Sequence, residues 1–202
     1  VKARYAALSA DKSAKRQDWS DLIKELRREA KAKGFWLPHM PHSVGGMGLG
    51  VTALAAVSAE AAKVPYGPYI LNAHAPDEGN MHTLHHFATE YQREHYLNPL
   101  LEGEVRSCFS MTEPEVAGSD PTLIQTSAVE DGDDWVINGH KWFTSGARGA
   151  SCCGSSARWP ARHAAGWTGR RCAGLGGQPG SGAPLPGDRW ICASPRPRRR
   201  HS

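Results

Sequence analysis

The sequence predicts an α+β fold, in which an N-terminal all-α helical domain is followed by the start of an antiparallel β domain and a disordered C-terminal tail. Three observations carry this prediction: helical periodicity through roughly the first half of the chain, alternation of apolar and polar residues after Arg106, and a change of composition at Ala150. Helices followed by a meander of strands are typical of α+β proteins or of two domains in series. We therefore expect a helical domain over 1–105, a partial middle β domain over 106–150 and a tail over 151–202.

The clearest helix signal covers residues 18–33. Large apolar residues recur there at the spacing of one helical face, with charged residues on the other. Ser20 or Asp21 can cap the first turn through a side-chain oxygen, and Gly34 favours a stop because glycine adopts the left-handed conformation easily. The apolar residues of the face are Leu22, Ile23 and Leu26.

Three further helices are predicted before the β part begins. One covers residues 52–63, is rich in alanine, and ends before Pro65 because proline cannot continue a helix. Another lies within residues 67–86. The last covers residues 89–101, where Thr89 can cap the first turn and a glycine follows the end.

An alternation typical of β-strands begins near Arg106. Two turn signals punctuate it, Asp-Gly-Asp-Asp at 131–134 and Asn-Gly at 138–139, and the second is the stronger hairpin signal. We therefore expect an antiparallel meander in which the Asn-Gly pair turns the chain back on itself. The segments expected to be extended are 106–112, 126–130, 135–138 and 140–144. The residues expected to be buried are Phe109, Met111, Trp135, Ile137 and Phe143.

The last quarter of the chain differs from the rest in charge and composition. Residues 1–150 hold 15 Lys and Arg against 19 Asp and Glu, whereas residues 151–202 hold nine Arg and one acid, Asp188. The second segment has two Leu, one Ile and no Val, Phe, Tyr or Met, too little branched apolar surface to offset the ordering of its backbone. A natural tail rich in Arg and Pro is one explanation. We favour the other, a shifted reading frame, because three tryptophans are scattered through the segment.

Cysteine usage and hydropathy indicate the compartment and the class of partner. Only Cys108 precedes residue 150, as in an intracellular protein with reduced thiols, and the four cysteines of the tail lack the paired C-x-x-C spacing of zinc ribbons. No apolar run approaches the ~20 residues that span a bilayer, and the first residues lack the apolar core of a signal peptide. We therefore expect a soluble, cytoplasmic protein without a membrane span. The short basic run at 196–200 is typical of solvated charge and does not indicate nucleic-acid binding.

Two motifs in the β part carry the strongest functional signal. The first is Cys-Phe-Ser-Met-Thr-Glu-Pro-Glu-Val-Ala-Gly-Ser-Asp at 108–120, and the second is Trp-Val-Ile-Asn-Gly-His-Lys-Trp-Phe-Thr-Ser-Gly at 135–146. In order and spacing they resemble the F-x-M-T-E-P…G-S-D loop and the W-x-I-N-G-x-K-W-x-T/S strand pair of the acyl-CoA dehydrogenase family. Segments at 75–81 and 97–103 extend the resemblance to residues 20–148.

The resemblance implies a fold and an activity. The extra residue between Pro114 and Gly118 is most similar to the long-chain subgroup of the family, of which only the N-terminal domain and part of the middle domain are represented. A member of this family is an FAD-dependent oxidoreductase of fatty acid metabolism, which dehydrogenates an acyl-CoA thioester to the enoyl-CoA.

The resemblance also implies which residues bind the flavin and the substrate. An isoalloxazine ring needs donors at its polar edge and an apolar wall against its face, and the segments 109–112 and 142–145 can supply both. The turn at 118–120 suits a phosphate or pantetheine group, and the resemblance makes Ser119 a contact of both FAD and acyl-CoA. The cofactor-binding residues expected are Phe109, Met111, Thr112, Gly118, Ser119, Trp142, Phe143, Thr144 and Ser145.

No catalytic residue is expected within this sequence. Dehydrogenation needs a carboxylate that takes the α-proton, and the resemblance places the glutamate base of the family in a later part of the chain. We expect neither Glu113 nor Glu115 to replace it. The 202-residue chain is therefore predicted to be a truncated, inactive acyl-CoA dehydrogenase. The alternative is a non-catalytic, decayed gene product that binds a flavin or a partner protomer weakly. By resemblance, the partners are acyl-CoA, an electron-transfer flavoprotein or similar acceptor, and further copies in a homo-oligomer.

Two other patterns suggest chemistry only weakly. The Gly-Gly-Met-Gly-Leu-Gly run at 45–50 follows no predicted strand and lacks the Lys-Ser/Thr of a P-loop, so a tight turn into the next helix is the better interpretation. His82, His85 and His86 share one helical face, but no H-E-x-x-H motif is present and an exposed polar face is the ordinary explanation. We expect no metal site.

Overall fold

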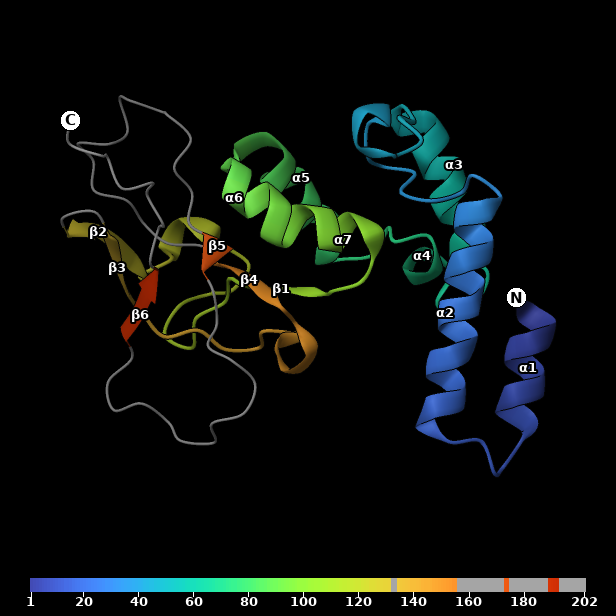
Figure 1. Cartoon of the computed structure of the whole chain (residues 1–202). Helices are drawn as coiled ribbons and strands as arrows, with labels where there is room; N and C mark the ends of the chain where they lie inside the picture. Colours follow the sequence, from blue (N-terminus) through green and yellow to red (C-terminus); the bar gives the residue numbers. More distant parts are fainter. Residues whose placement is uncertain (132–133, 156–172, 175–188, 193–202) are drawn as a thin grey trace. The chain divides into compact units, whose positions relative to one another are not determined.

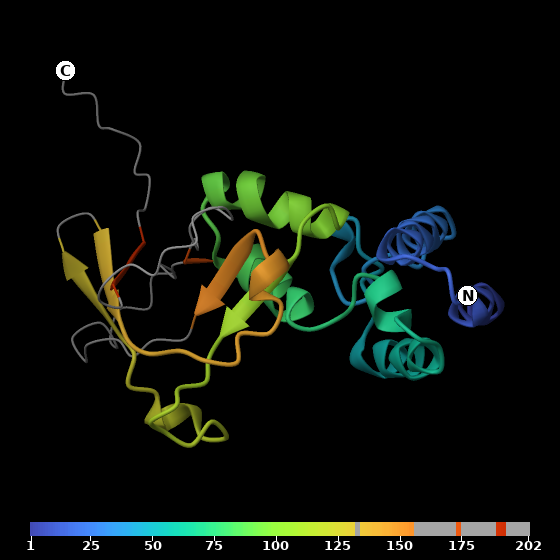
Figure 2. The ribbon, with the colours of Figure 1, turned by 90° about the horizontal axis from the view of Figure 1, so that it is seen from below.

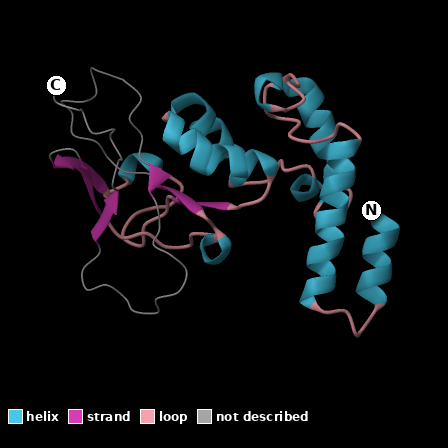
Figure 3. Ribbon diagram, in the orientation of Figure 1, coloured by secondary structure: helices cyan, strands magenta, loops and turns pink. Residues whose placement is uncertain are grey.

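The computed structural model describes residues 1–131, 134–155, 173–174 and 189–192. Helices occupy the first part of the chain and the strands follow them (Figures 1 and 3), which is the predicted α+β order. The chain divides into two compact units. The first comprises Val1–His82 with Leu101–Gly103, and the second comprises Thr83–Leu100 with Glu104–Ser202.

The first unit is helical, and one cluster of its core lies between the second and fourth helices. Its elements are α1 (Lys2–Ala10), α2 (Arg16–Ala32), the 3-10 turn η1 (His42–Val44), α3 (Val51–Ala62) and α4 (Gly67–Ile70), and α5 (Asp77–Phe87) begins in it. The predicted apolar face of α2 is confirmed: Leu26 and Ala30 are buried and pack with Ile70 of α4. Within the described part of the chain, no helix combines the length and apolar content needed to cross a membrane.

The start of α2 differs from the prediction. The helix begins at Arg16, so Ser20 and Asp21 lie inside it and do not cap it. Asp18 supplies the cap instead, because its Oδ2 accepts a hydrogen bond from the Lys15 amide at 2.7 Å. An acid in the first turn also interacts favourably with the positive end of the helix dipole.

The Gly-rich run at 45–50 is a tight turn, as predicted. Gly45 has a φ of 79°, in the left-handed region that favours glycine. An ideal Cβ on Gly46 would lie 2.1 Å from the Met40 carbonyl oxygen, so the backbone passes there only without a side chain. The left-handed conformation of Gly45 and the close packing at Gly46 explain these two glycines.

The segment 67–86, predicted to contain a helix, holds α4 and most of α5, and the chain turns at Asn72 between them. Asn72 has a φ of 57°, and asparagine tolerates this left-handed conformation better than most residues. Its buried side chain accepts a hydrogen bond from Arg27 at 2.9 Å and donates one to the Leu101 carbonyl at 3.3 Å. These bonds stabilise the turn between the two helices.

The helix predicted over 89–101 is confirmed, together with both of its ends. It consists of α6 (Glu90–Gln92), a π-helical turn η2 (Arg93–Leu97) and α7 (Asn98–Glu102). Thr89 caps the start, since its hydroxyl accepts a hydrogen bond from the Gln92 amide at 3.3 Å. Gly103 follows the end with a φ of 72°, as expected for a C-terminal glycine.

The strands of the second unit form two small sheets. They are β1 (Ser107–Ser110), β2 (Ser127–Asp131), β3 (Asp134–Asn138), β4 (Cys152–Ser155), β5 (Ala173–Gly174) and β6 (Arg189–Cys192). One sheet has the order β2-β3-β6 and is antiparallel. The other has the order β1-β4-β5, in which β1 and β4 are parallel and lie side by side in Figures 1 and 2. The predicted hairpin between 126–130 and 135–138 is therefore confirmed as β2 and β3.

The strand predicted over 140–144 and the hairpin predicted at 138–139 are wrong. Asn138 ends β3, and residues 139–151 form no strand. The glycine of the Asn-Gly pair has a packing role instead: an ideal Cβ on Gly139 would lie 2.1 Å from Thr126 Oγ1 and 2.7 Å from Thr126 Cα. The Asn-Gly pair therefore does not mark a hairpin; its glycine lets the backbone at 139 pass close to Thr126.

The tail was predicted to form no regular structure, yet three short strands, β4, β5 and β6, lie in it. Each pairs through its backbone, which needs no branched apolar side chains. The prediction for the rest of the tail falls on 156–172, 175–188 and 193–202, which lie outside the described residues.

Candidate functional site

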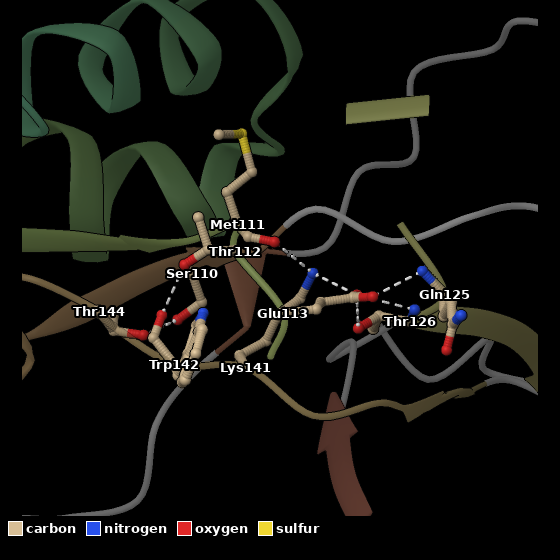
Figure 4. Close-up of polar contacts among 9 residues, drawn as sticks. All are labelled: Ser110, Met111, Thr112, Glu113, Gln125, Thr126, Lys141, Trp142 and Thr144. Carbon is tan, nitrogen blue, oxygen red and sulfur yellow. Dashed lines mark hydrogen bonds and ion pairs between the residues drawn. The ribbon is translucent and has the colours of Figure 1, made fainter. Parts of the chain in front are cut away.

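Two segments that are far apart in the sequence meet where the quoted motifs place the flavin site. The Trp142 amide donates to the Thr112 carbonyl at 3.2 Å, and the Thr112 hydroxyl donates to the Trp142 carbonyl at 2.9 Å. A third bond joins the hydroxyls of Ser110 and Thr144 at 2.8 Å (Figure 4). The chain after β1 therefore runs beside residues 142–144, although the latter are not a strand.

Four large apolar side chains of these segments are exposed: Phe109 by 40%, Met111 by 36%, Trp142 by 44% and Phe143 by 78%. We call these four residues the apolar face. Phe109, Met111 and Phe143 were predicted to be buried, and that prediction is wrong. In β1 the inward positions are taken by Cys108 and Ser110, so strand alternation turns Phe109 outward.

Of the other residues predicted to be buried, Ile137 is confirmed at 8% exposure. The prediction for the Trp135 side chain lies outside the described residues. Several large apolar side chains exposed on two adjoining segments are typical of a binding site and not of a solvated surface.

The backbone of Phe143 is unusual. Its φ is 50°, a left-handed conformation that an aromatic residue rarely adopts. The ring lies 4.6 Å from the Trp142 ring, centroid to centroid, with 43° between the planes. Strained backbone of this kind is concentrated at ligand sites, where the surrounding structure maintains it.

Glu113 follows Met111 and Thr112 in the sequence and holds this segment in place through its carboxylate (Figure 4). Its carboxylate is buried and accepts hydrogen bonds from the amides of Gln125 at 2.7 Å and Thr126 at 2.9 Å, and from the Thr126 hydroxyl. Lys141 Nζ donates to Glu113 Oε1 at 2.8 Å and to the Met111 carbonyl at 2.8 Å. Burial raises the pKa of Glu113, but the bonds from Lys141, Thr126 and Gln125 outweigh it and lower that pKa to about 2.

The turn at 118–120 lies close to the same segments. An ideal Cβ on Gly118 would be 3.1 Å from Thr112 Cγ2, so the glycine approaches the Thr112 side chain. Asp120 accepts hydrogen bonds from the Thr122 amide at 2.9 Å and hydroxyl at 2.6 Å, and so caps the 3-10 turn η3 (Pro121–Leu123). Ser119 is exposed on this turn.

The structure thus brings together most of the predicted site residues. Thr112, Trp142, Phe143, Thr144 and Gly118 are linked by the contacts above, whereas Ser119 and Ser145 are exposed loop residues. The sequence prediction missed the supporting residues Ser110, Lys141, Thr126 and Gly139. Lys141 and Gly139 lie within the quoted motif at 135–146, which was the signal that could have identified them.

His82, His85 and His86 lie on α5, where the sequence shows one polar face. The His39 and His82 rings share a hydrogen bond of 3.2 Å, and His39 Nε2 lies 3.1 Å from the Asn72 carbonyl oxygen. Because the carbonyl can only accept, His39 donates to it through Nε2. At least His82 therefore has a role in packing.

Comparisons with known proteins identify the family. The model of the acyl-CoA dehydrogenase N-terminal domain matches residues 3–104, and that of the acyl-CoA dehydrogenase middle domain matches residues 108–171. The probable acyl-CoA dehydrogenase FadE2 of Mycobacterium tuberculosis is 44% identical over 149 residues, which are 74% of this chain and 35% of FadE2. Human acyl-CoA dehydrogenase family member 11 is 42% identical over 65% of this chain and 16% of its own length.

Solved structures are similar over the same part of the fold. A Mycobacterium abscessus protein assigned as an acyl-CoA dehydrogenase superposes with a TM-score of 0.64 and 37% identity, covering 68% of this chain and 34% of that one. A glutaryl-CoA dehydrogenase of Mycobacterium smegmatis in complex with FADH2 gives a TM-score of 0.52 at 23% identity, covering 75% of this chain and 39% of that one. The chain spans about a third of the length of FadE2 and of these structures. The N-terminal domain model matches about half of the residues of this chain, and the chain therefore belongs to the acyl-CoA dehydrogenase family.

Proposed function

We propose that the apolar face and the segments around it form part of the flavin site of an FAD-dependent oxidoreductase, which dehydrogenates an acyl-CoA thioester to the enoyl-CoA. The observation that carries the proposal is the pairing of Thr112 with Trp142 beside exposed aromatic rings. A planar apolar ring system with a polar edge fits such a surface, because the rings supply a wall and nearby backbone and hydroxyl groups supply hydrogen bonds. Bound FAD would supply the hydride acceptor for the oxidation.

The roles proposed for single residues follow from where they lie. Phe109, Met111, Trp142 and Phe143 would contact the isoalloxazine ring. Polar contacts of the cofactor would come from Thr112, Thr144, Ser145, Gly118 and Ser119, and Ser119 would also contact the acyl-CoA. The FADH2 of the M. smegmatis enzyme belongs to a structure whose low identity supports the fold alone, so the proposal for FAD rests on family membership and on the apolar face.

Neither Glu113 nor Glu115, the glutamates of the motif at 108–120, suits the role of the base that takes the α-proton. Glu113 is buried and saturated with donors, and a carboxylate with a pKa of about 2 is a weak base at neutral pH. Glu115 is exposed and bonded to His140 Nδ1 at 2.8 Å. Turnover of acyl-CoA by the 202-residue chain alone is therefore still predicted to be absent. A dye-coupled assay over graded acyl chain lengths tests that prediction.

Family membership also supports proposals about partners. Acyl-CoA as substrate, an electron-transfer flavoprotein or similar acceptor, and a homo-oligomer remain proposals for the whole protein, as does a cytoplasmic location. The long-chain subgroup remains a proposal as well.

The test of the proposed function is FAD binding by the 202-residue chain, measured by quenching of flavin fluorescence and by absorbance of the complex. The variant Phe143→Ala should lower the affinity by ~10-fold, which corresponds to ~1.4 kcal/mol. Phe35→Ala is the matched control, since Phe35 is an exposed phenylalanine of the first unit, outside the apolar face. Equal affinities of the two variants, or no binding by the wild-type chain, would contradict the proposal.

A further inference from the structure

Glu113 and Lys141 form an ion pair that is largely removed from solvent. The Glu113 side chain is 2% exposed and the Lys141 side chain 12%, with Nζ and Oε1 2.8 Å apart. Burial of two charges costs desolvation energy, which their attraction repays only when the remaining donors and acceptors are also satisfied. A buried ion pair is therefore weak evidence for added stability. We ask instead which segments of the chain this pair holds in place.

The pair joins three segments that are far apart in the sequence. Lys141 also donates to the Met111 carbonyl, and Glu113 also accepts from the amides of Gln125 and Thr126, which directly precede β2. Figure 4 shows the lysine between the Met111 carbonyl and the carboxylate. Each charged group thus makes bonds to the backbone of another segment, which restricts how those segments can shift.

Two of these segments carry the apolar face. Met111 belongs to it, and Lys141 directly precedes Trp142, whose backbone is bonded to Thr112. Neither charged group belongs to the residues proposed to contact the cofactor. We propose that Glu113 and Lys141 are positioning residues of the flavin site, which fix the backbone segments of Met111 and Trp142 against each other; this inference rests on the proposed function for the identity of the ligand.

The electrostatics of the carboxylate agree with this role. The pKa of Glu113 is lowered to about 2, so the carboxylate stays ionised and keeps its bond to Lys141 over the whole neutral range. Groups around a site that act by orienting its direct contacts typically change ligand affinity or activity by ~10–100-fold when they are replaced, as measured at metal sites.

The test uses the 202-residue chain and compares Lys141→Met, which keeps the length of the side chain but removes its charge, with the conservative Lys141→Arg. Lys63→Met is the matched control, because Lys63 forms an exposed ion pair with Glu60 within the first unit. Two quantities are measured: the FAD dissociation constant, and the hydrogen-exchange rate of the Trp142 amide. Far-UV circular dichroism checks that the helices are retained.

Lys141→Met should weaken FAD binding by ~10-fold or more and accelerate exchange of the Trp142 amide. Lys141→Arg should restore both the affinity and the slow exchange at least in part. Lys63→Met should change neither quantity. Wild-type affinity in Lys141→Met, or unchanged Trp142 exchange, would overturn the inference. A general loss of stability is distinguished by the exchange of amides in α6 and α7, which it would accelerate together with that of Trp142, whereas loss of positioning accelerates exchange at Trp142 and leaves those helices unchanged. Should Lys141→Met lose its helical signal, Glu113→Gln is measured in its place with the same expected outcomes.

The two proposals can fail separately. If the wild-type chain binds no FAD, the proposed function fails, and the Trp142 exchange rate alone decides on the pair: faster exchange in Lys141→Met supports positioning, and unchanged exchange overturns it. If the wild-type chain binds FAD and Lys141→Met binds it equally well, the proposed function stands and the positioning role is wrong.

Discussion

At the scale of single residues, Glu113 illustrates how a carboxylate quoted in a motif can serve a structural purpose. Its four hydrogen bonds from Gln125, Thr126 and Lys141 stabilise the ionised form in the folded state. A group whose pKa is lower in the folded than in the unfolded state adds stability above the unfolded-state pKa. That contribution disappears as the pH falls through the folded-state pKa.

The pH dependence of stability should therefore reveal Glu113. The pKa drops from 4.5 to about 2, so the residue should contribute ~3 kcal/mol above about pH 5, and this should be lost between about pH 5 and pH 2. Glu113→Gln should remove that part of the pH dependence. Denaturant unfolding of wild type and variant from pH 2 to pH 7 measures it. Parallel curves for the two proteins would mean that the carboxylate is not stabilised in this way.

Gly139 is a second residue of a quoted motif that serves a structural purpose, in this case because it has no side chain. Because an ideal Cβ there would meet the Thr126 backbone and hydroxyl, Gly139→Ala should destabilise the second unit by ~1–3 kcal/mol through overpacking. Gly79→Ala in α5 is the control, since nothing lies within 4 Å of an ideal Cβ at Gly79. That control should stabilise the helix by ~0.5–1 kcal/mol. Thermal unfolding measures both, and a neutral Gly139→Ala would contradict the packing.

At the scale of elements, the ends of the helical segment from α6 to α7 follow the local rules of helix capping. Thr89→Ala removes the bond between the Thr89 hydroxyl and the Gln92 amide, and should cost ~1 kcal/mol. Thr52→Ala, at an exposed position of α3, serves as the control and should be neutral or slightly stabilising because alanine has the higher helix propensity. The comparison is made by thermal unfolding, and equal midpoints for the two variants would refute the capping role.

Elements with strong local signals could be predicted from the sequence, and those set by distant contacts could not. Residues close in the sequence predict the buried side of α2, the cap at Thr89 and the β2–β3 hairpin. The break at Asn72 depends on its bonds to Arg27 and to the Leu101 carbonyl, which periodicity does not register.

The candidate site shows the same division. The motifs indicated which residues meet, but an apolar residue in a strand pattern was taken to be buried. Phe109 and Phe143 are exposed because the inward positions of β1 are occupied by Cys108 and Ser110 and because Phe143 adopts a left-handed backbone. Which face of an extended segment is covered depends on the fold around it and, at a binding site, on the ligand.

At the scale of the whole molecule, the chain combines a helical unit with a unit of two small sheets, and it spans about a third of the length of relatives such as FadE2. The N-terminal and middle-domain family models match successive parts of it. The proposed flavin contacts all lie between residues 109 and 145, within the second unit. The account therefore predicts a local effect of the cofactor on the chain.

Hydrogen exchange of the 202-residue chain with and without FAD, resolved by peptide, tests this central claim most directly. We predict slower exchange in the presence of FAD for peptides covering 109–113 and 141–145, and unchanged exchange in α3, whose side chains are largely exposed and which lies in the first unit. Unchanged exchange in both peptides at saturating FAD, or protection confined to other parts of the chain, would contradict the account.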